Sequence, residues 1–175
     1  MKRLLNWIFV VSIVSFGVGV DDLHNTELGF VGTYEFRSNT TIPESISLTA
    51  EYAKSRNLEL TDEEAFLIGD TVWEMVNEYN FEPAEILALI EIESYFKPNA
   101  ISCKEAKGLM QIMTCDHRGN IWLEELTRTG IINKETEVFE INNNIRAGCY
   151  ILNKAYFETQ DMDRAYWRYL GAVNH

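Results

Sequence analysis

The 175-residue sequence is short of basic residues, and this shortage excludes a class of partner. It contains 15 Lys and Arg against 27 Asp and Glu, which gives a formal net charge of -12. A broad basic surface that could neutralise phosphates is therefore not expected, so nucleic acid is not a predicted partner. The acidic excess is typical of a well-solvated surface.

Residues that commonly bind metals are also few. The sequence has three histidines, which are scattered: His24, His117 and His175. Neither a Cys-x-x-Cys pair nor a His-rich spacing occurs. The sequence therefore predicts no zinc site and implies no other metal or organic cofactor.

Strand patterns, internal repeats and low-complexity segments are missing as well. Apolar residues make up 46% of the chain and charged residues 24%, a balance that is typical of a globular protein. The length suits one domain with short additions. The predicted fold class is mainly α.

The longest apolar run lies at the N-terminus. Lys2 and Arg3 precede apolar residues 4–20, and two aspartates follow them. This pattern is typical of an export signal, and its length also suits an uncleaved membrane anchor. No cysteine follows that would indicate lipoprotein processing. We therefore expect residues 1–20 to direct the protein to the periplasm or cell envelope, with membrane contact only through this segment.

Helical patterns begin after a variable arm at residues 21–60, in which a short helix is expected near LTAEYAKSR. Thr61 and Glu64 have capping-box spacing, and Pro83 suits the first position of a second helix, expected to end near Tyr95. Further helices are expected within residues 119–130, from about residue 140 and from about residue 161. Residues 61–175 are thus predicted to form one helical domain.

The second helix ends with two glutamates that are not equivalent. Ile86, Leu89, Ile90 and Glu93 follow i, i+3, i+4, i+7 spacing, so Glu93 continues an apolar stripe. Glu91 is rotated about 200° from it and is expected to point outward. Burial should raise the pKa of Glu93 above about 4.3, so that it could donate a proton to a leaving oxygen. On this pattern alone, a boundary residue or a salt-bridge partner is the commoner interpretation.

A longer pattern surrounds Glu93. The chain reads ESYFKPNAIS over residues 93–102, AKGLMQIM over residues 106–113 and NNNIRAGCYIL over residues 142–152. These words closely resemble the signature of the soluble-type lytic transglycosylases, relatives of goose-type lysozyme that cleave peptidoglycan. The resemblance covers roughly residues 61–171. It implies a lysozyme-like, mainly α domain (SLT domain).

The resemblance implies that Glu93 is the single catalytic acid and base. It would protonate the glycosidic oxygen between N-acetylmuramic acid and N-acetylglucosamine. It would then deprotonate the muramoyl C6 hydroxyl, which closes onto C1 and leaves a 1,6-anhydro end. Because the substrate supplies the nucleophile, no second carboxylate is required. The implied partner is the peptidoglycan glycan strand.

Substrate-binding roles are implied for several further residues. Ser94 would orient Glu93 or the sugar, although a bond to its own helix backbone is an equal alternative. Met110 would form a wall of the sugar site or pack in the core. The amide of Gln111 would bond an N-acetyl group, and Asn144 matches the family's Asn-Ile-x-x-Gly helix.

Near the C-terminus the family has a tyrosine against the catalytic glutamate. Tyr169 in RYLGAV is the best match, and Tyr166 is the rival. Leu170 replaces an expected Asn, Glu105 stands where the family often has Gly, and the chain stops before the usual closing helix. These departures suggest reduced activity or a partner that completes the cleft.

Cysteine adds one expectation for an exported protein. Of three cysteines, Cys103 and Cys115 are nearest in sequence, and a disulfide between them would brace the loop that contains Glu105. Cys149 would then remain as a free thiol.

Three hypotheses follow. The leading one is an exported lytic transglycosylase, with a specialised role such as opening the wall for a secretion or conjugation apparatus or for a phage. The second is a lysozyme-type hydrolase, in which Asp116 would hold a water opposite Glu93. The third is a noncatalytic wall-binding or assembly protein, which the Leu170 position suggests.

Overall fold

The computed structural model describes residues 42–114 and 122–171. All of them belong to one compact unit that spans Asn39–His175. The predicted signal or anchor at residues 1–20 lies outside the described residues, as do Cys115 and Asp116. None of the described helices is both long and apolar enough to cross a membrane.

The described residues are mainly helical, which confirms the predicted fold class. The elements are α2 (Ile42–Arg56), α3 (Asp62–Tyr79), α4 (Pro83–Ser94), α5 (Leu123–Arg128), the 3-10 helix η2 (Glu135–Phe139), α6 (Ile141–Thr159) and α7 (Met162–Tyr169). Strands do not form within these ranges. Two isolated antiparallel bridges are present instead, and both involve Lys107, which pairs with Ile101 and with Ile112.

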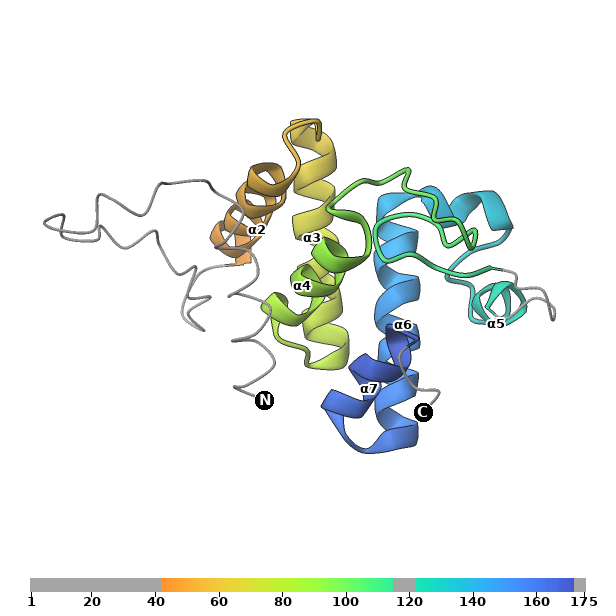
Figure 1. Ribbon diagram of the computed structural model, residues 1–175. Helices are drawn as coiled ribbons and strands as arrows, with labels where there is room; N and C mark the ends of the chain where they lie inside the picture. The colour runs from red at the N-terminus through yellow and green to blue at the C-terminus, as the bar shows by residue number, and fades with distance from the viewer. Residues whose placement is uncertain (1–41, 115–121, 172–175) are drawn as a thin grey trace, which may run out of the picture. The chain divides into compact units, whose positions relative to one another are not determined.

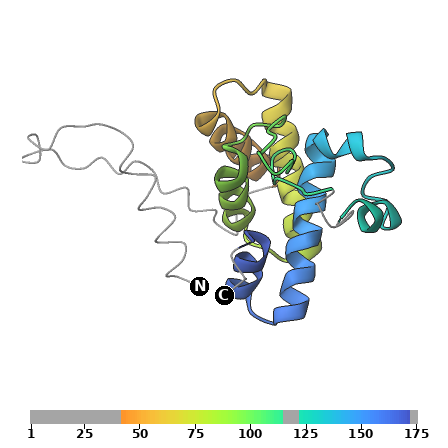
Figure 2. The same cartoon turned by 45° about the vertical axis from the view of Figure 1, so that its right-hand side comes forward.

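Helix α3 is central to the arrangement, because it packs against α2, α4 and α6. Figure 1 shows α2 on one side of α3 and α4, and α6 on the other side. Helix α7 folds back against α6, which also contacts η2. The turned view in Figure 2 shows the same order, with α5 beyond α6. The loop between α4 and α5 runs from the end of α4 across to α6.

Local signals set the helix starts. Thr61 Oγ1 accepts from the Glu64 amide at 3.1 Å and Glu64 Oε2 accepts from the Thr61 amide at 2.9 Å, which confirms the predicted capping box. Pro83 is the first residue of α4, also as predicted. Asp161 caps α7, because its Oδ1 accepts from the Arg164 amide at 3.1 Å.

The apolar stripe of α4 lies in the core. Its fully buried members are Ile86, Leu87, Leu89 and Ile90. On α3, Ala65 and Val72 are buried while Trp73 and Val76 are half-buried. Burial of apolar side chains such as these, from α3 and α4, supplies the main stabilising free energy.

Helix α2 packs closely on α3 at Gly69. A Cβ atom at Gly69 would lie 2.6 Å from the backbone oxygen of Ile46, so only glycine permits this approach. Trp73 Nε1 donates to Thr49 Oγ1 at 3.0 Å across the same interface. Residues 42–56 of the predicted arm therefore form a helix that packs directly on the helices after Thr61.

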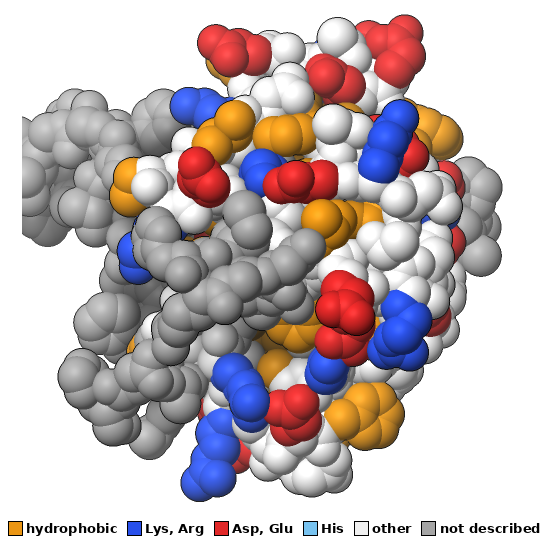
Figure 3. Space-filling model, turned by 90° about the vertical axis from the view of Figure 1, so that its right-hand side faces the viewer, with side chains coloured by type: hydrophobic (Ala, Val, Ile, Leu, Met, Phe, Trp, Pro, Cys, Tyr) orange, Lys and Arg blue, Asp and Glu red, His pale blue; other side chains and the backbone are white. Residues whose placement is uncertain are grey.

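The surface carries mixed charge. On the face drawn in Figure 3, acidic and basic side chains of the described residues alternate with apolar ones. Several basic side chains of the described residues pair with acidic ones, as in the ion pairs Arg146–Glu74 and Arg168–Glu158, both 2.7 Å.

Candidate active site

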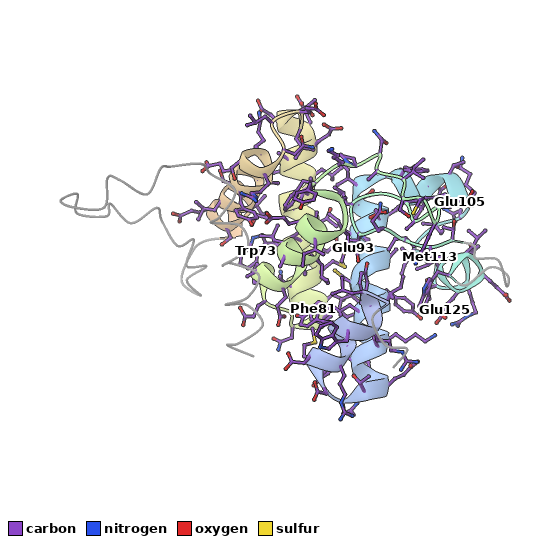
Figure 4. The ribbon with its side chains drawn as sticks, in the orientation of Figure 1. Trp73, Phe81, Glu93, Glu105, Met113 and Glu125 are labelled. Atoms are coloured by element: carbon purple, nitrogen blue, oxygen red, sulfur yellow. The ribbon has the colours of Figure 1, made fainter. Side chains whose placement is uncertain are left out.

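Glu93 lies in the last turn of α4. Figure 4 shows Glu93 on the side of α4 that faces α6, whereas Trp73 of α3 lies toward α2. Its side chain is half-buried, and this burial raises the pKa of the carboxyl from 4.5 to about 7. Among the described residues, no group hydrogen-bonds or ion-pairs with it. The carboxyl can therefore hold a proton near neutral pH and present it to a ligand.

The prediction that Glu91 points outward to solvent is wrong. Tyr52 Oη donates to Glu91 Oε2 at 2.6 Å, and the Arg56 guanidinium pairs with Glu91 Oε1. Only 13% of the Glu91 side chain is exposed. Helical rotation separates the two carboxyls as predicted, but α2 covers the side that was expected to face solvent. That contact spans 35 residues of sequence, so local spacing could not indicate it.

The chain turns sharply after Glu93. Tyr95 and Phe96 both adopt left-handed backbone conformations, with φ of 52° and 57°. The side chain of Phe96 is fully buried, and its ring meets the Tyr52 ring edge to face at 5.9 Å. Asn57 Nδ2 donates to the Phe96 carbonyl at 2.8 Å. Contacts from α2 thus reach the turn that ends the Glu93 helix.

The loop that follows combines backbone–backbone hydrogen bonds with hydrogen bonds from its backbone to polar side chains. Ser102 Oγ accepts from the amides of Lys104 and Ala106, at 3.2 and 3.1 Å. Glu105 between them has a left-handed φ of 63°, which explains why glycine suits this position in the resemblance. Figure 4 places Glu105 on the outer part of the loop, away from Glu93. Cys103 is exposed on the same loop, and its pairing with Cys115 stays a prediction.

Asn144 fixes the inner part of the loop to α6. Its Oδ1 accepts from the Met110 amide at 2.7 Å, and its Nδ2 donates to the carbonyls of Lys107 and Val138 at 2.9 and 2.6 Å. The side chain is buried, so these bonds are made away from water. Gly108 passes so close that a Cβ there would lie 2.2 Å from Asn144 Nδ2. Asn144 therefore holds the loop in its conformation. Any effect of Asn144 on substrate binding would be indirect, by way of that conformation.

Met110 fills the space above Gly148. Its side chain is fully buried, and a Cβ at Gly148 would lie 2.3 Å from its sulfur. Asn144 and Gly148 are four residues apart on one face of α6 and contact successive parts of the loop. The Asn-Ile-x-x-Gly and Gly-Leu-Met-Gln motifs therefore pack directly against each other. Of the two roles considered for Met110, the structure shows the second, because its side chain packs in the core.

Ser94 and Gln111 also bond to nearby backbone. Ser94 is buried, and its Oγ donates to the Ile90 carbonyl at 3.1 Å. Gln111 Nε2 donates to the carbonyls of Ala100 and Gly108, at 3.3 and 3.0 Å. Its side-chain carbonyl makes no hydrogen bond within the described ranges. That oxygen can accept from an N–H group of a ligand.

Tyr169 is the tyrosine that lies near Glu93. Its hydroxyl donates to the Met110 carbonyl at 2.7 Å. Its pKa is raised well above 10, by burial first and then by the charge of Glu93. The Tyr166 hydroxyl instead lies buried beside Glu85, and burial followed by the charge of Glu85 raises its pKa. Of the two candidates, the structure thus brings Tyr169 toward the glutamate.

These contacts join residues 106–113 to α6 through Asn144 and to Tyr169, which lies near Glu93. Comparison with protein families identifies the domain that contains them. The family described as "Transglycosylase SLT domain" matches residues 71–174, more than half of the chain. The chain belongs to this family. Its mainly helical fold is accordingly the lysozyme-like fold of an SLT domain. Comparisons with curated proteins and with solved structures gave no match.

The SLT match includes Glu93 and all its predicted neighbours but begins after α2. It also includes a cluster that no sequence pattern indicated. Lys107 Nζ donates to Thr114 Oγ1 at 2.7 Å and to Glu135 Oε1 at 2.5 Å, and Thr114 is fully buried. The hydrogen bond from Lys107 lowers the pKa of Glu135. This cluster fixes the far end of the loop after α4 to η2.

Proposed function

We propose that the protein is a peptidoglycan lytic transglycosylase that cleaves the β-1,4 bond between N-acetylmuramic acid and N-acetylglucosamine. One observation carries the proposal. Glu93, which lies within the residues matched by the SLT family and which the sequence resemblance implies as the acid, presents a half-buried carboxyl whose pKa is raised to about 7. Such a group is protonated at the pH where it must donate and is still acidic enough to accept a proton back.

The reaction needs only this one carboxyl. Glu93 gives its proton to the glycosidic oxygen as the bond to the muramoyl C1 breaks, and an oxocarbenium-like centre forms. The carboxylate then takes the proton of the C6 hydroxyl while O6 bonds to C1. The products are a free N-acetylglucosamine 4-hydroxyl and a 1,6-anhydromuramoyl end. No water is consumed, and Glu93 ends protonated as it began.

Two neighbours support this chemistry. The free side-chain carbonyl of Gln111 is suited to accept from the N–H of an acetamido group, and its amide is already fixed by two backbone bonds. Tyr169 keeps its proton at neutral pH and lies close enough to interact with the Glu93 charge. A fixed hydroxyl and a fixed carbonyl orient a sugar without reorganisation in the reaction.

The test compares wild type with Glu93→Gln on purified sacculi, with mass spectrometry of the released muropeptides. Wild type should release ends that are lighter than reducing ends by one water. Glu93→Gln should lower the rate by about 100-fold or more, because the amide cannot donate the proton. Undiminished digestion by Glu93→Gln would exclude Glu93 as the acid. Reducing ends alone would favour the hydrolase, and sacculus binding without release would favour a wall-binding protein.

We also propose that the enzyme acts in the cell envelope, since its substrate lies outside the cytoplasmic membrane. The support is the basic and apolar pattern of residues 1–20. A specialised wall-opening role, in secretion, conjugation or phage infection, is the finer form of this proposal. Fractionation of cells that express the full chain or a chain without residues 2–20 tests export, because only the full chain should reach the envelope.

A further inference from the structure

The last turn of α4 is fixed from the side opposite Glu93. Glu91 accepts a hydrogen bond from Tyr52 Oη at 2.6 Å and pairs with the Arg56 guanidinium. Both donors lie on the last two turns of α2. Because about 200° of helical rotation separates residues two apart, a contact at Glu91 restrains the rotation of α4 and leaves Glu93 on the other side.

A second contact reaches the residues just after that turn. Tyr95 and Phe96 are consecutive non-glycine residues with left-handed backbone, a conformation that is unfavourable for such residues. It persists where surrounding contacts fix it. Asn57, which directly follows α2, supplies one such contact with its 2.8 Å hydrogen bond to the Phe96 carbonyl. The edge-to-face Tyr52 ring supplies another.

Helix α2 can act as a support because it is itself fixed. Its backbone lies against Gly69 of α3, closer than any other residue would permit, and Thr49 accepts from Trp73 Nε1. Yet α2 precedes residues 71–174, which match the SLT family. A contact made by α2 therefore lies outside the residues that the family match covers.

We propose that Tyr52, Arg56 and Asn57, here called the α2 contacts, are positioning residues that fix the end of α4 and thereby the catalytic carboxyl. The inference rests on the proposed function of Glu93. None of the three touches the reacting atoms. Their effect passes through Glu91 and through the turn at Phe96. The functional unit accordingly includes α2.

Loss of the α2 contacts should change the chemistry more than the binding of substrate. A looser helix end displaces the Glu93 carboxyl, and a displacement of about 1 Å can lower a rate by up to about 100-fold. It also admits water, which should lower the pKa of Glu93 from about 7 toward 4.5. Tyr169 is the titratable side chain that faces Glu93 from α7, and it stays neutral at these pH values. The alkaline limb of the pH–rate profile should therefore move to lower pH.

The experiment uses the full chain with Arg56→Met and Asn57→Ala. Lys54→Met is the matched control, since Lys54 lies on the same helix and pairs with Asp62 at the start of α3, away from α4. Release of soluble muropeptides from sacculi gives kcat and KM from pH 5 to 9, and thermal unfolding gives Tm. We expect kcat to fall on the order of tenfold in both test variants, with KM nearly unchanged. Arg56→Lys should retain most of the activity, because the ion pair to Glu91 remains.

Specific outcomes separate the two proposals. If Glu93→Gln is inactive but Arg56→Met and Asn57→Ala match Lys54→Met in kcat and pH profile, the α2 contacts have no positioning role. If Glu93→Gln is active, the proposed function of Glu93 is wrong, and this inference, which depends on it, is wrong as well. Tyr52→Phe removes a single hydroxyl and keeps the ring contact, so it tests the same point should a larger change unfold the protein. An unchanged pH profile in Tyr52→Phe would count against the proposal.

Discussion

Two regions flank Glu93, and they are built by different means. On one side lie α2 and α3, whose backbone groups are bonded within each helix, so that the side chains of Tyr52, Arg56 and Asn57 make the hydrogen bonds to the end of α4 and the turn after it. On the other side lies the loop of residues 97–114, which combines backbone hydrogen bonds of its own with hydrogen bonds to side chains of other elements. Asn144 of α6 makes two such bonds to the loop and a third to the Val138 carbonyl of η2. The sequence motifs that resemble the SLT family thus concentrate where particular side chains bond the loop backbone, whereas α2 contains none of these motifs.

The largest effect should come from breaking the loop side. Asn144→Ala removes three buried hydrogen bonds, each of which contributes about 1 kcal/mol net. We expect the free energy of unfolding to fall by about 3 kcal/mol or more, measured by urea denaturation. Thr61→Ala is the matched control on the helical side, where the loss of one exposed cap bond should cost about 1 kcal/mol. Equal losses in the two variants would contradict the proposed difference between the regions.

A smaller effect should come from separating α2 from α3. In Gly69→Ala, the new Cβ would lie 2.6 Å from the backbone oxygen of Ile46, so the helices must move apart. Overpacking of this kind costs about 1–3 kcal/mol, and the better helix propensity of alanine offsets part of it. Asp70→Ala, on the exposed neighbour, should change Tm little. If Gly69→Ala kept both Tm and activity, α2 would not be a fixed support.

The smallest effect should appear at Glu93 itself, between the two regions, as a pH dependence of stability. Its folded pKa of about 7 exceeds the ordinary 4.5, so the unfolded state releases the proton first and stability falls as pH rises from about 4.5 to 7. Glu93→Gln carries no such charge. It should be more stable than wild type at pH 8 by about 1 kcal/mol, after allowance for solvent screening, and equal to it at pH 4. A gain of the same size at both values would show that burial of charge is not the cause.

Local sequence predicted the helices well, because their signals are local. The Thr61 capping box and Pro83 at the start of α4 depend on residues within one turn, and both are confirmed. The placement of Glu93 on the buried stripe followed from the same periodicity. By contrast, the prediction for Glu91 was wrong, because its partners lie 35 and 39 residues earlier, on a helix whose direction periodicity does not give.

The motifs in and around the loop were recognised from the sequence, but the hydrogen bonds and packing contacts that their residues make were not. Asn144 was expected at the substrate, and it is instead buried under the loop with its amide fully used. The amide of Gln111 was expected to bond an N-acetyl group, and in the described structure its carbonyl oxygen is free of hydrogen bonds to do so while its nitrogen is bonded to backbone. A motif fixes which residues are present and how far apart, whereas hydrogen-bond partners depend on how distant segments pack.

By itself, then, the sequence determined the helical class, the family-type motif and which of two glutamates lies on the buried stripe, since these depend on composition and on spacing within a few turns. Only the tertiary structure decided what surrounds that stripe. It placed α2 behind Glu91 and brought Tyr169 to Glu93. It also bonded the loop to α6 through Asn144. These contacts join residues 34 to 76 positions apart, and their geometry follows from the packing of whole helices rather than from any local pattern.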